Sequence, residues 1–296
     1  RETMATGIAR PTLWGATLSG CVGAGVGWWV LEHTRSWQVV EMLPSKALAP
    51  LLVAVPVLWA THRFLTGRYG DKSAIVCQNT AFGIGIASAV SVAFIRSSPE
   101  LLVSVKDDGH AAFGVFGLLL CFYHAAEFTS VAVFNPPLLS NSSFLFSTSY
   151  SSAMLVAVIE YFVEARFAPW LKGWAPVTLL GLTGCVLGEA LRKLALIQAG
   201  HNFTHLISDG SRRPEHRLVT HGVYSISRHP GYLGWFWWSV SSQVLLGNPL
   251  AACLFAFVSF QFFKDRIGYE EYHLERFFPG YAEYRERVPT RIPFIP

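Results

Sequence analysis

Charged residues are scarce in this sequence. Asp, Glu, Lys and Arg make up 14% of the 296 residues, whereas hydrophobic residues make up 52%. This balance, together with a mean hydropathy of +0.37, excludes an ordinary soluble domain and predicts a polytopic membrane protein. The net charge of +4 is modest and dispersed along the chain, so no nucleic-acid partner is expected.

Cysteine motifs and nucleotide-binding motifs are absent as well. The five cysteines lie inside apolar runs without CxxC spacing, which predicts small packing residues rather than disulfides or metal ligands. They are Cys21, Cys77, Cys121, Cys185 and Cys253. The histidines between positions 201 and 229 match no zinc-binding spacing, so no metal is predicted. No GxGxxG motif follows a strand, which excludes a Rossmann domain.

Long apolar runs are what the chain has in abundance. Six of them favour membrane-spanning helices, and the predicted fold class is therefore an all-α helix bundle. These runs cover residues 11–31, 47–65, 74–95, 111–134, 150–167 and 175–197. No clear cleavage site follows the first run, which favours a span over a signal peptide.

A shorter apolar pair near the C-terminus predicts a helical hairpin. The Trp-rich run 232–246 stops at Gly247, which suits the left-handed residue that ends a helix. Asn248 is expected to cap the next helix and Pro249 to occupy its first turn, and the helix should continue to 277–280. Each arm has only about 15 apolar residues, so the arms are either short spans or a re-entrant pair.

The hairpin raises the count to about eight spans. Basic residues concentrate after the second and sixth runs, so the positive-inside rule places these connections and both termini in the cytosol. We predict a transmembrane bundle at 1–197, and a catalytic region at 198–296 that contains a cytosolic linker, the hairpin and the tail. The sequons at Asn141 and Asn202 would then face the cytosol and are interpreted as accidental.

Four polar residues interrupt the apolar runs. His124 and Glu127 are three residues apart in one run, and Glu160 and Glu164 are four apart in the next. Such residues either pair with each other or with basic groups at helix ends, or line a functional cavity. The spacing leaves both interpretations open.

Two polar segments flank the Trp-rich arm and its partner. Histidines and tyrosines recur between positions 201 and 232, where Gly222 and Gly231 allow close backbone approach, and this pattern predicts a pocket for a nucleoside-like ligand. Arg266 and Glu270 lie four apart on one helical face. They form either an ordinary helix pair or a site at which the guanidinium binds a carboxylate or phosphate. The hairpin should bring both segments to one membrane face.

Several motifs are similar to those of isoprenylcysteine carboxyl methyltransferases. RHPGYLGW is followed by DRIGYEE and then by YAEYRERVPTRIPF, as in the C-terminal signature of that family. YHAAEF, GEALRKLAL, HNFTHLIS and HRLVTHGVY also resemble the eukaryotic members, so the resemblance covers most of the chain. The short RHPxYxG core alone is shared with phospholipid methyltransferases and membrane sterol reductases.

The resemblance implies transfer of a methyl group from S-adenosyl-L-methionine, without a metal, to the C-terminal carboxylate of an S-prenylated cysteine. The acceptors would be processed CaaX proteins such as small GTPases, at the endoplasmic reticulum membrane with the active site facing the cytosol. By resemblance, Arg266 and Glu270 meet the carboxylate and act as the catalytic pair. The implied cosubstrate-binding residues are Ser208, His216, Arg217, Leu218, Val219, Tyr224, His229, Pro230, Gly231 and Tyr232.

Two other functions compete with this interpretation. A membrane sterol or isoprenoid reductase would use a nicotinamide phosphate cofactor and would require additional basic residues for the extra phosphate. A non-catalytic transporter or scaffold would bind no S-adenosyl ligand.

Overall fold

A computed structural model describes residues 23, 72–97, 110–207, 214 and 216–296 of the chain. The predicted spans at 47–65 and, apart from Gly23, at 11–31 lie outside the described residues, as does Ser208. The chain divides into two compact units, Arg1–Ser147 and Thr148–Pro296. Every regular element within the described ranges is a helix, in agreement with the predicted all-α class.

Among the described residues, the first unit has two long helices and the second has five α-helices. In the first unit, α3 (Lys72–Ser97) packs against α4 (His110–Phe134), and the 3₁₀ turns η2 (Pro136–Leu138) and η3 (Asn141–Phe144) follow. The α-helices of the second unit are α5 (Thr148–Phe167), α6 (Ala175–Ala199), α7 (Pro230–Leu245), α8 (Pro249–Phe277) and α9 (Tyr281–Arg287). Its 3₁₀ turns are η4 (Pro169–Leu171), η5 (Gly200–Asn202) and η6 (Gly222–Ser225).

Four of the six longer predicted spans fall within described helices, namely α3, α4, α5 and α6. By length and composition, Ala111–Phe134 and Asn141–Phe167 are the two segments apolar enough to cross a membrane within the described ranges.

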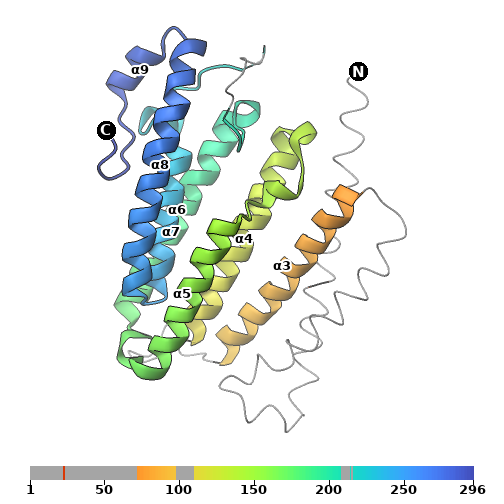
Figure 1. Cartoon of the computed structure of the whole chain (residues 1–296), viewed down its shortest axis with the longest axis vertical. Helices are drawn as coiled ribbons and strands as arrows, with labels where there is room; N and C mark the ends of the chain where they lie inside the picture. The colour runs from red at the N-terminus through yellow and green to blue at the C-terminus, as the bar shows by residue number, and fades with distance from the viewer. Residues whose placement is uncertain (1–22, 24–71, 98–109, 208–213, 215) are drawn as a thin grey trace. The chain divides into compact units, whose positions relative to one another are not determined.

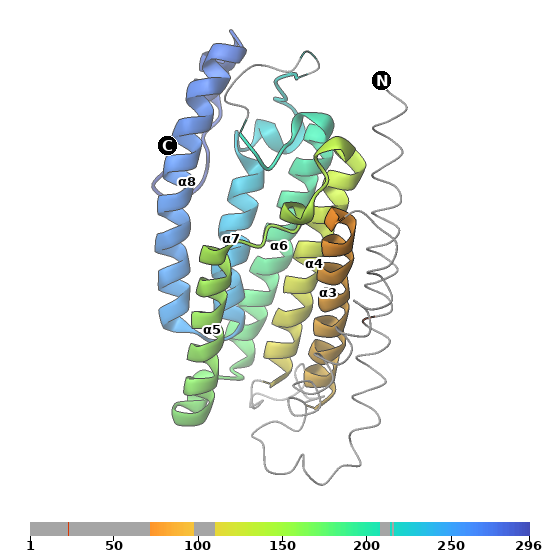
Figure 2. The ribbon, with the colours of Figure 1, turned by 45° about the vertical axis from the view of Figure 1, so that its right-hand side comes forward.

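Helix α7 lies between α6 and α8 and packs against both (Figures 1 and 2). Glycines allow the backbones of α6 and α7 to meet. A Cβ atom on Gly188 would lie 2.6 Å from the Gly234 carbonyl oxygen, and one on Gly234 would lie 2.5 Å from the Gly188 oxygen. Since Cβ atoms do not approach a backbone so closely, any larger residue at either position would push the helices apart. This contact holds the start of α7 against the middle of α6.

The hairpin has the predicted boundaries but a different cap. Gly247 has a φ of +61° and Pro249 is the first residue of α8, as expected. Asn248 occupies the N-cap position, as predicted, but its side chain does not make the capping hydrogen bond that was expected of it. Instead, the Glu160 carboxylate accepts hydrogen bonds from the backbone N–H groups of Leu250 (2.9 Å) and Ala251 (2.7 Å). A full negative charge at the positive end of the helix dipole is favourable there.

The side-chain oxygen of Asn248 accepts a hydrogen bond from a buried lysine instead. Lys172 Nζ donates to Asn248 Oδ1 (2.7 Å), to the main-chain oxygens of Leu246 and Gly247, and to the Glu164 carboxylate (2.7 Å). Burial lowers the pKa of Lys172, and the Glu164 carboxylate opposes this effect. The two acidic residues of α5 therefore have structural partners. Glu160 caps α8, and Glu164 pairs with Lys172.

In the first unit, His124 and Glu127 are buried on α4. His124 Nδ1 lies 2.6 Å from the main-chain oxygen of Phe144, and the imidazole stacks on the Phe146 ring with the centroids 4.0 Å apart. The histidine thus joins α4 to the segment that follows η3.

Candidate active site

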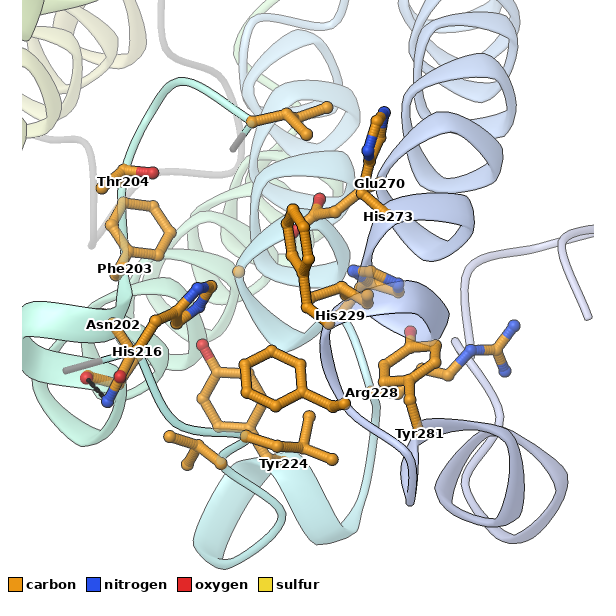
Figure 3. A pocket seen from close by; sticks show the side chains of 18 of the residues that line it. Asn202, Phe203, Thr204, His216, Tyr224, Arg228, His229, Glu270, His273 and Tyr281 are labelled. Carbon is orange, nitrogen blue, oxygen red and sulfur yellow. Dashed lines mark hydrogen bonds between the residues drawn. The ribbon is translucent and has the colours of Figure 1, made fainter. Parts of the chain in front are cut away.

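A pocket lies in the second unit, where α6 ends and α7 begins. The end of α8, helix α9 and the segment between α6 and α7 complete its wall. In Figure 3, the side chains of Asn202, Phe203 and His216 lie on one side of the pocket, and those of His229 and Glu270 lie on the other. The lining includes these predicted residues: His216, Arg217, Leu218, Val219, Tyr224, His229, Pro230, Gly231, Tyr232 and Glu270.

Asn202 joins the two segments that form one side of the pocket. Its side-chain nitrogen donates to the main-chain oxygen of Ala199 (2.9 Å), and its side-chain oxygen accepts from the backbone N–H of Arg217 (2.8 Å). These bonds hold the 216–219 segment against the end of α6. Asn202 therefore has a structural use, although the sequence drew attention to it only as a sequon.

Tyr224 occupies the pocket wall from the turn η6. The turn begins at Gly222, whose φ is +62° and where a Cβ atom would clash with the Gln198 side chain. The Tyr224 hydroxyl donates to the Ala195 oxygen (3.3 Å), and the Tyr224 main-chain oxygen accepts from the Tyr284 hydroxyl (2.6 Å). Burial raises the pKa of Tyr224, so the hydroxyl remains protonated and can donate its hydrogen to the Ala195 oxygen.

An arginine, a histidine and a glutamate form a buried ionic cluster beside the pocket. Arg228 Nε donates to Glu271 Oε1 (2.5 Å), and His229 Nε2 lies 2.9 Å from the same oxygen. The Tyr281 hydroxyl also donates to it (3.2 Å). Burial by itself raises the pKa of Glu271, but hydrogen bonds from His229 and Arg228 outweigh that effect and hold the pKa at about 2. Glu271 is therefore ionised, and it fixes the His229 ring in the pocket wall.

Arg228 also holds the C-terminal segment in place. Its guanidinium donates to the main-chain oxygens of Val288 (3.0 Å) and Pro296 (2.7 Å), and its backbone N–H donates to Pro289 (3.2 Å). The segment after α9 thus packs against the start of α7. Arg228 consequently connects the tail to the pocket wall.

Helix α8 carries both Arg266 and Glu270. Glu270 lines the pocket, whereas Arg266 is not among the lining residues and contacts Tyr232 of the pocket wall, so the two α8 residues are not joined directly. The Tyr232 hydroxyl lies between them: it donates to Glu270 Oε2 (2.6 Å) and accepts from Arg266 Nε (2.8 Å). Arg266 Nη2 donates to the main-chain oxygen of His205 (2.6 Å). The ordinary helix pair suggested by the four-residue spacing is replaced by a three-residue arrangement that spans α7 and α8.

The ring of Tyr232 stacks on two other aromatic rings. It stacks on His229 with the centroids 5.4 Å apart and an interplanar angle of 7°, and it also stacks on Phe263 at 5.0 Å. The Arg266 guanidinium carbon lies 5.5 Å from the Tyr232 centroid, within the range of a cation–π contact. One tyrosine therefore contacts both predicted groups of site residues.

Sequence reasoning did not identify the Arg228–Glu271 cluster or the tyrosines of α9. Two signals could have found them. Adjacent helical residues point about 100° apart, so the Glu270–Glu271 doublet must face two different environments. Tyr281 and Tyr284 are three residues apart and share one face of a helix, which indicates that this face is buried.

The comparisons with known proteins identify the family. The profile of the isoprenylcysteine carboxyl methyltransferase family matches residues 179–276. Protein-S-isoprenylcysteine O-methyltransferase B of Arabidopsis thaliana is 44% identical over 192 residues, which cover 64% of this chain and 97% of that protein. The Homo sapiens protein-S-isoprenylcysteine O-methyltransferase is 41% identical over 197 residues, covering 66% of this chain and 69% of the human protein.

A solved structure extends the similarity to nearly the whole chain. The structure of a eukaryotic intramembrane Ras methyltransferase, an isoprenylcysteine carboxyl methyltransferase, superposes with a TM-score of 0.78 at 30% identity. The match covers 98% of each chain. From the Arabidopsis relative, the family profile and this superposition together, it follows that the chain belongs to the isoprenylcysteine carboxyl methyltransferase family.

Proposed function

We propose that this methyltransferase transfers a methyl group from S-adenosyl-L-methionine to the C-terminal carboxylate of S-prenylated cysteine on processed CaaX proteins, small GTPases among them. The observation that carries the proposal is the position of Arg266, whose guanidinium is bound to a tyrosine of the pocket wall. A cationic group so placed suits a carboxylate acceptor beside a bound methyl donor.

The pocket residues fit the proposed methyl donor. Its lining combines the aromatic rings of Phe203, Tyr224 and Phe278 with imidazoles and with the backbone of 216–219, and this set suits both a purine and an amino-acid group. His216, Arg217, Leu218, Val219, Tyr224, His229, Pro230, Gly231 and Tyr232 would hold the donor, and Ser208 belongs to the same proposal. When bound, S-adenosyl-L-methionine supplies a methyl group on a positively charged sulfur.

The protein's part in the reaction is positioning. A C-terminal carboxyl group has a pKa of about 3.5, so it is ionised at neutral pH and needs no general base. Arg266 would bind this carboxylate and orient one oxygen toward the pocket, and Glu270 would hold the arginine through Tyr232. Fixing two reactants in a near-attack geometry can supply about 7–11 kcal/mol of a reaction barrier.

The chain is an intramembrane protein, and we propose that it is a multi-pass protein of the endoplasmic reticulum with about eight spans. The pocket would open to the cytosol, where the charged methyl donor is available. The prenyl group would remain in the membrane, since its transfer from water contributes about 0.8 kcal/mol per methylene. The family relationship favours this function over the reductase and transporter alternatives.

The proposed function is tested by incubating the purified protein with a labelled methyl donor and a short farnesylcysteine acceptor. We expect label to enter the acceptor as a methyl ester, and a cysteine acceptor without the prenyl group to remain unlabelled. In the same assay, Arg266→Ala should reduce kcat/KM about 100-fold, because a charged hydrogen bond worth about 3 kcal/mol is lost, with little change in donor affinity. No esterification by the wild-type protein would refute the proposal.

A further inference from the structure

The hydroxyl of Tyr232 both donates and accepts a hydrogen bond within the protein. It carries one hydrogen, which it donates to Glu270 Oε2, while its oxygen accepts from Arg266 Nε. It has no second hydrogen to give to a ligand in the pocket. The ring of Tyr232 can still form part of the donor site, but its hydroxyl faces the arginine and glutamate of α8.

The same contacts leave one end of Arg266 available. A guanidinium group has five N–H donors in a rigid plane. Nε donates to the Tyr232 hydroxyl, Nη2 donates to the His205 oxygen, and Nη1 has no hydrogen-bond partner among the described residues. Within the part of the chain that the structure describes, Arg266 is therefore bound at Nε and Nη2, and a carboxylate would be met through the end that carries Nη1.

Because the Tyr232 hydroxyl lies between them, Glu270 does not bind Arg266 directly. A carboxylate bound directly to Arg266 would compete with an incoming carboxylate for the same donors. With Tyr232 in between, Glu270 fixes the direction of the hydroxyl and takes none of the guanidinium hydrogens. The stacking of Tyr232 on both His229 and Phe263 restricts movement of the ring and so of its hydroxyl.

We propose that Tyr232 is a positioning residue for the acceptor: its hydroxyl, together with the His205 carbonyl, aims Arg266 so that Nη1 meets the carboxylate of the prenylated cysteine. This inference rests on the proposed function and assigns the hydroxyl of Tyr232 to acceptor recognition rather than to the methyl donor.

The test compares the affinities of farnesylcysteine and of its uncharged carboxamide for wild-type protein and for Tyr232→Phe. Wild type should prefer the acid by about tenfold or more, since a charged hydrogen bond contributes about 1.5 kcal/mol or more. Tyr232→Phe should lose most of this preference and raise the KM of the acid, while the Kd of S-adenosyl-L-methionine changes less than about twofold. A general loosening of the fold would weaken the acid and the amide equally.

Tyr272→Phe is the matched control. Its hydroxyl also accepts from an arginine, Arg276 Nη1 at 2.7 Å, but the pair lies on the exposed surface of α8. This variant should retain the acid preference. Arg266→Lys supplies a second test, because it keeps the charge and loses the Nε–H that Tyr232 accepts, and it too should lose the preference.

An unchanged acid preference in either Tyr232→Phe or Arg266→Lys would overturn the inference. If Tyr232→Phe lost much of its affinity for S-adenosyl-L-methionine and retained the acid preference, the hydroxyl would instead be assigned to binding of the methyl donor. These results differ from failure of the proposed function itself, which would appear as absence of methyl transfer by the wild-type protein.

Discussion

Glu271 and its partners illustrate how single residues support the pocket. Its carboxylate is hydrogen-bonded to the side chains of Arg228, His229 and Tyr281, and its own side chain is 9% exposed. Breaking such a buried pair costs about 3 kcal/mol or more, because the remaining charge is left without compensation. Since His229 lines the pocket, the stability of this cluster and the shape of the pocket depend on the same contacts.

Glu271→Gln should therefore lower the free energy of unfolding by about 3 kcal/mol at pH 7. Because folding lowers the pKa of Glu271 from 4.5 to about 2, its contribution is complete above about pH 4.5 and is lost as the pH falls toward 2. The stability difference between wild type and Glu271→Gln, measured by thermal unfolding, should shrink over that interval.

Glu275→Gln on the same helix provides the control. Glu275 pairs with Arg285 at 2.5 Å, but the carboxylate side chain is 37% exposed. A solvated pair of this kind contributes about 0–1 kcal/mol, so the variant should unfold close to the wild-type temperature. Equal destabilisation by the two substitutions would contradict the role assigned to burial.

At the scale of elements, the position of α7 against α6 determines where the pocket lies. The approach of Gly188 to Gly234 lets Arg192 of α6 reach the first turn of α7, where its Nη1 donates to the Gly231 oxygen (3.1 Å). The start of α7 carries His229 and Tyr232, and any separation of the two helices would move both residues.

Gly188→Ala should destabilise the protein by about 1–3 kcal/mol, the usual cost of overpacking a close helix contact. Gly268→Ala on α8 is the matched control, because a Cβ atom there would have no neighbour within 4 Å. It should be neutral or should stabilise by up to about 1 kcal/mol, since alanine favours a helix. The comparison is made by thermal unfolding in detergent, and similar unfolding temperatures for the two variants would contradict the packing argument.

At the scale of the whole molecule, the proposed topology places the two ends of the hairpin on opposite sides of a membrane. The pocket and α9 lie at one end of α7 and α8, and the Gly247 turn lies at the other (Figure 1). The charged donor and the prenylated acceptor would then meet on the cytosolic side.

Single cysteines test this arrangement in sealed vesicles. In a background from which the native cysteines are removed, a cysteine at Glu286 of α9 and one at Trp174, which is 58% exposed near η4, should react from opposite sides with a membrane-impermeant thiol reagent. Labelling of both positions from the same side would refute the proposed crossing of the hairpin.

The hairpin itself could be predicted from the sequence because its signals are local. A glycine that adopts positive φ and a proline at the first helical position depend on neighbouring backbone geometry alone, and Gly247 and Pro249 occupy those positions. The motifs around His229 and Arg266 likewise indicated which residues gather at the pocket, and the family relationship agrees with them.

Only the tertiary structure decided which partner each polar group takes. Glu160 caps α8 in place of Asn248, Tyr232 stands between Arg266 and Glu270, and Glu271 rather than Glu270 pairs with His229. The partners in these pairs are at least 34 residues apart along the chain, the smallest separation being that between Tyr232 and Arg266. No local spacing therefore encodes them. A buried polar group binds whatever donor or acceptor packing places within reach, and that choice is settled when the helices come together.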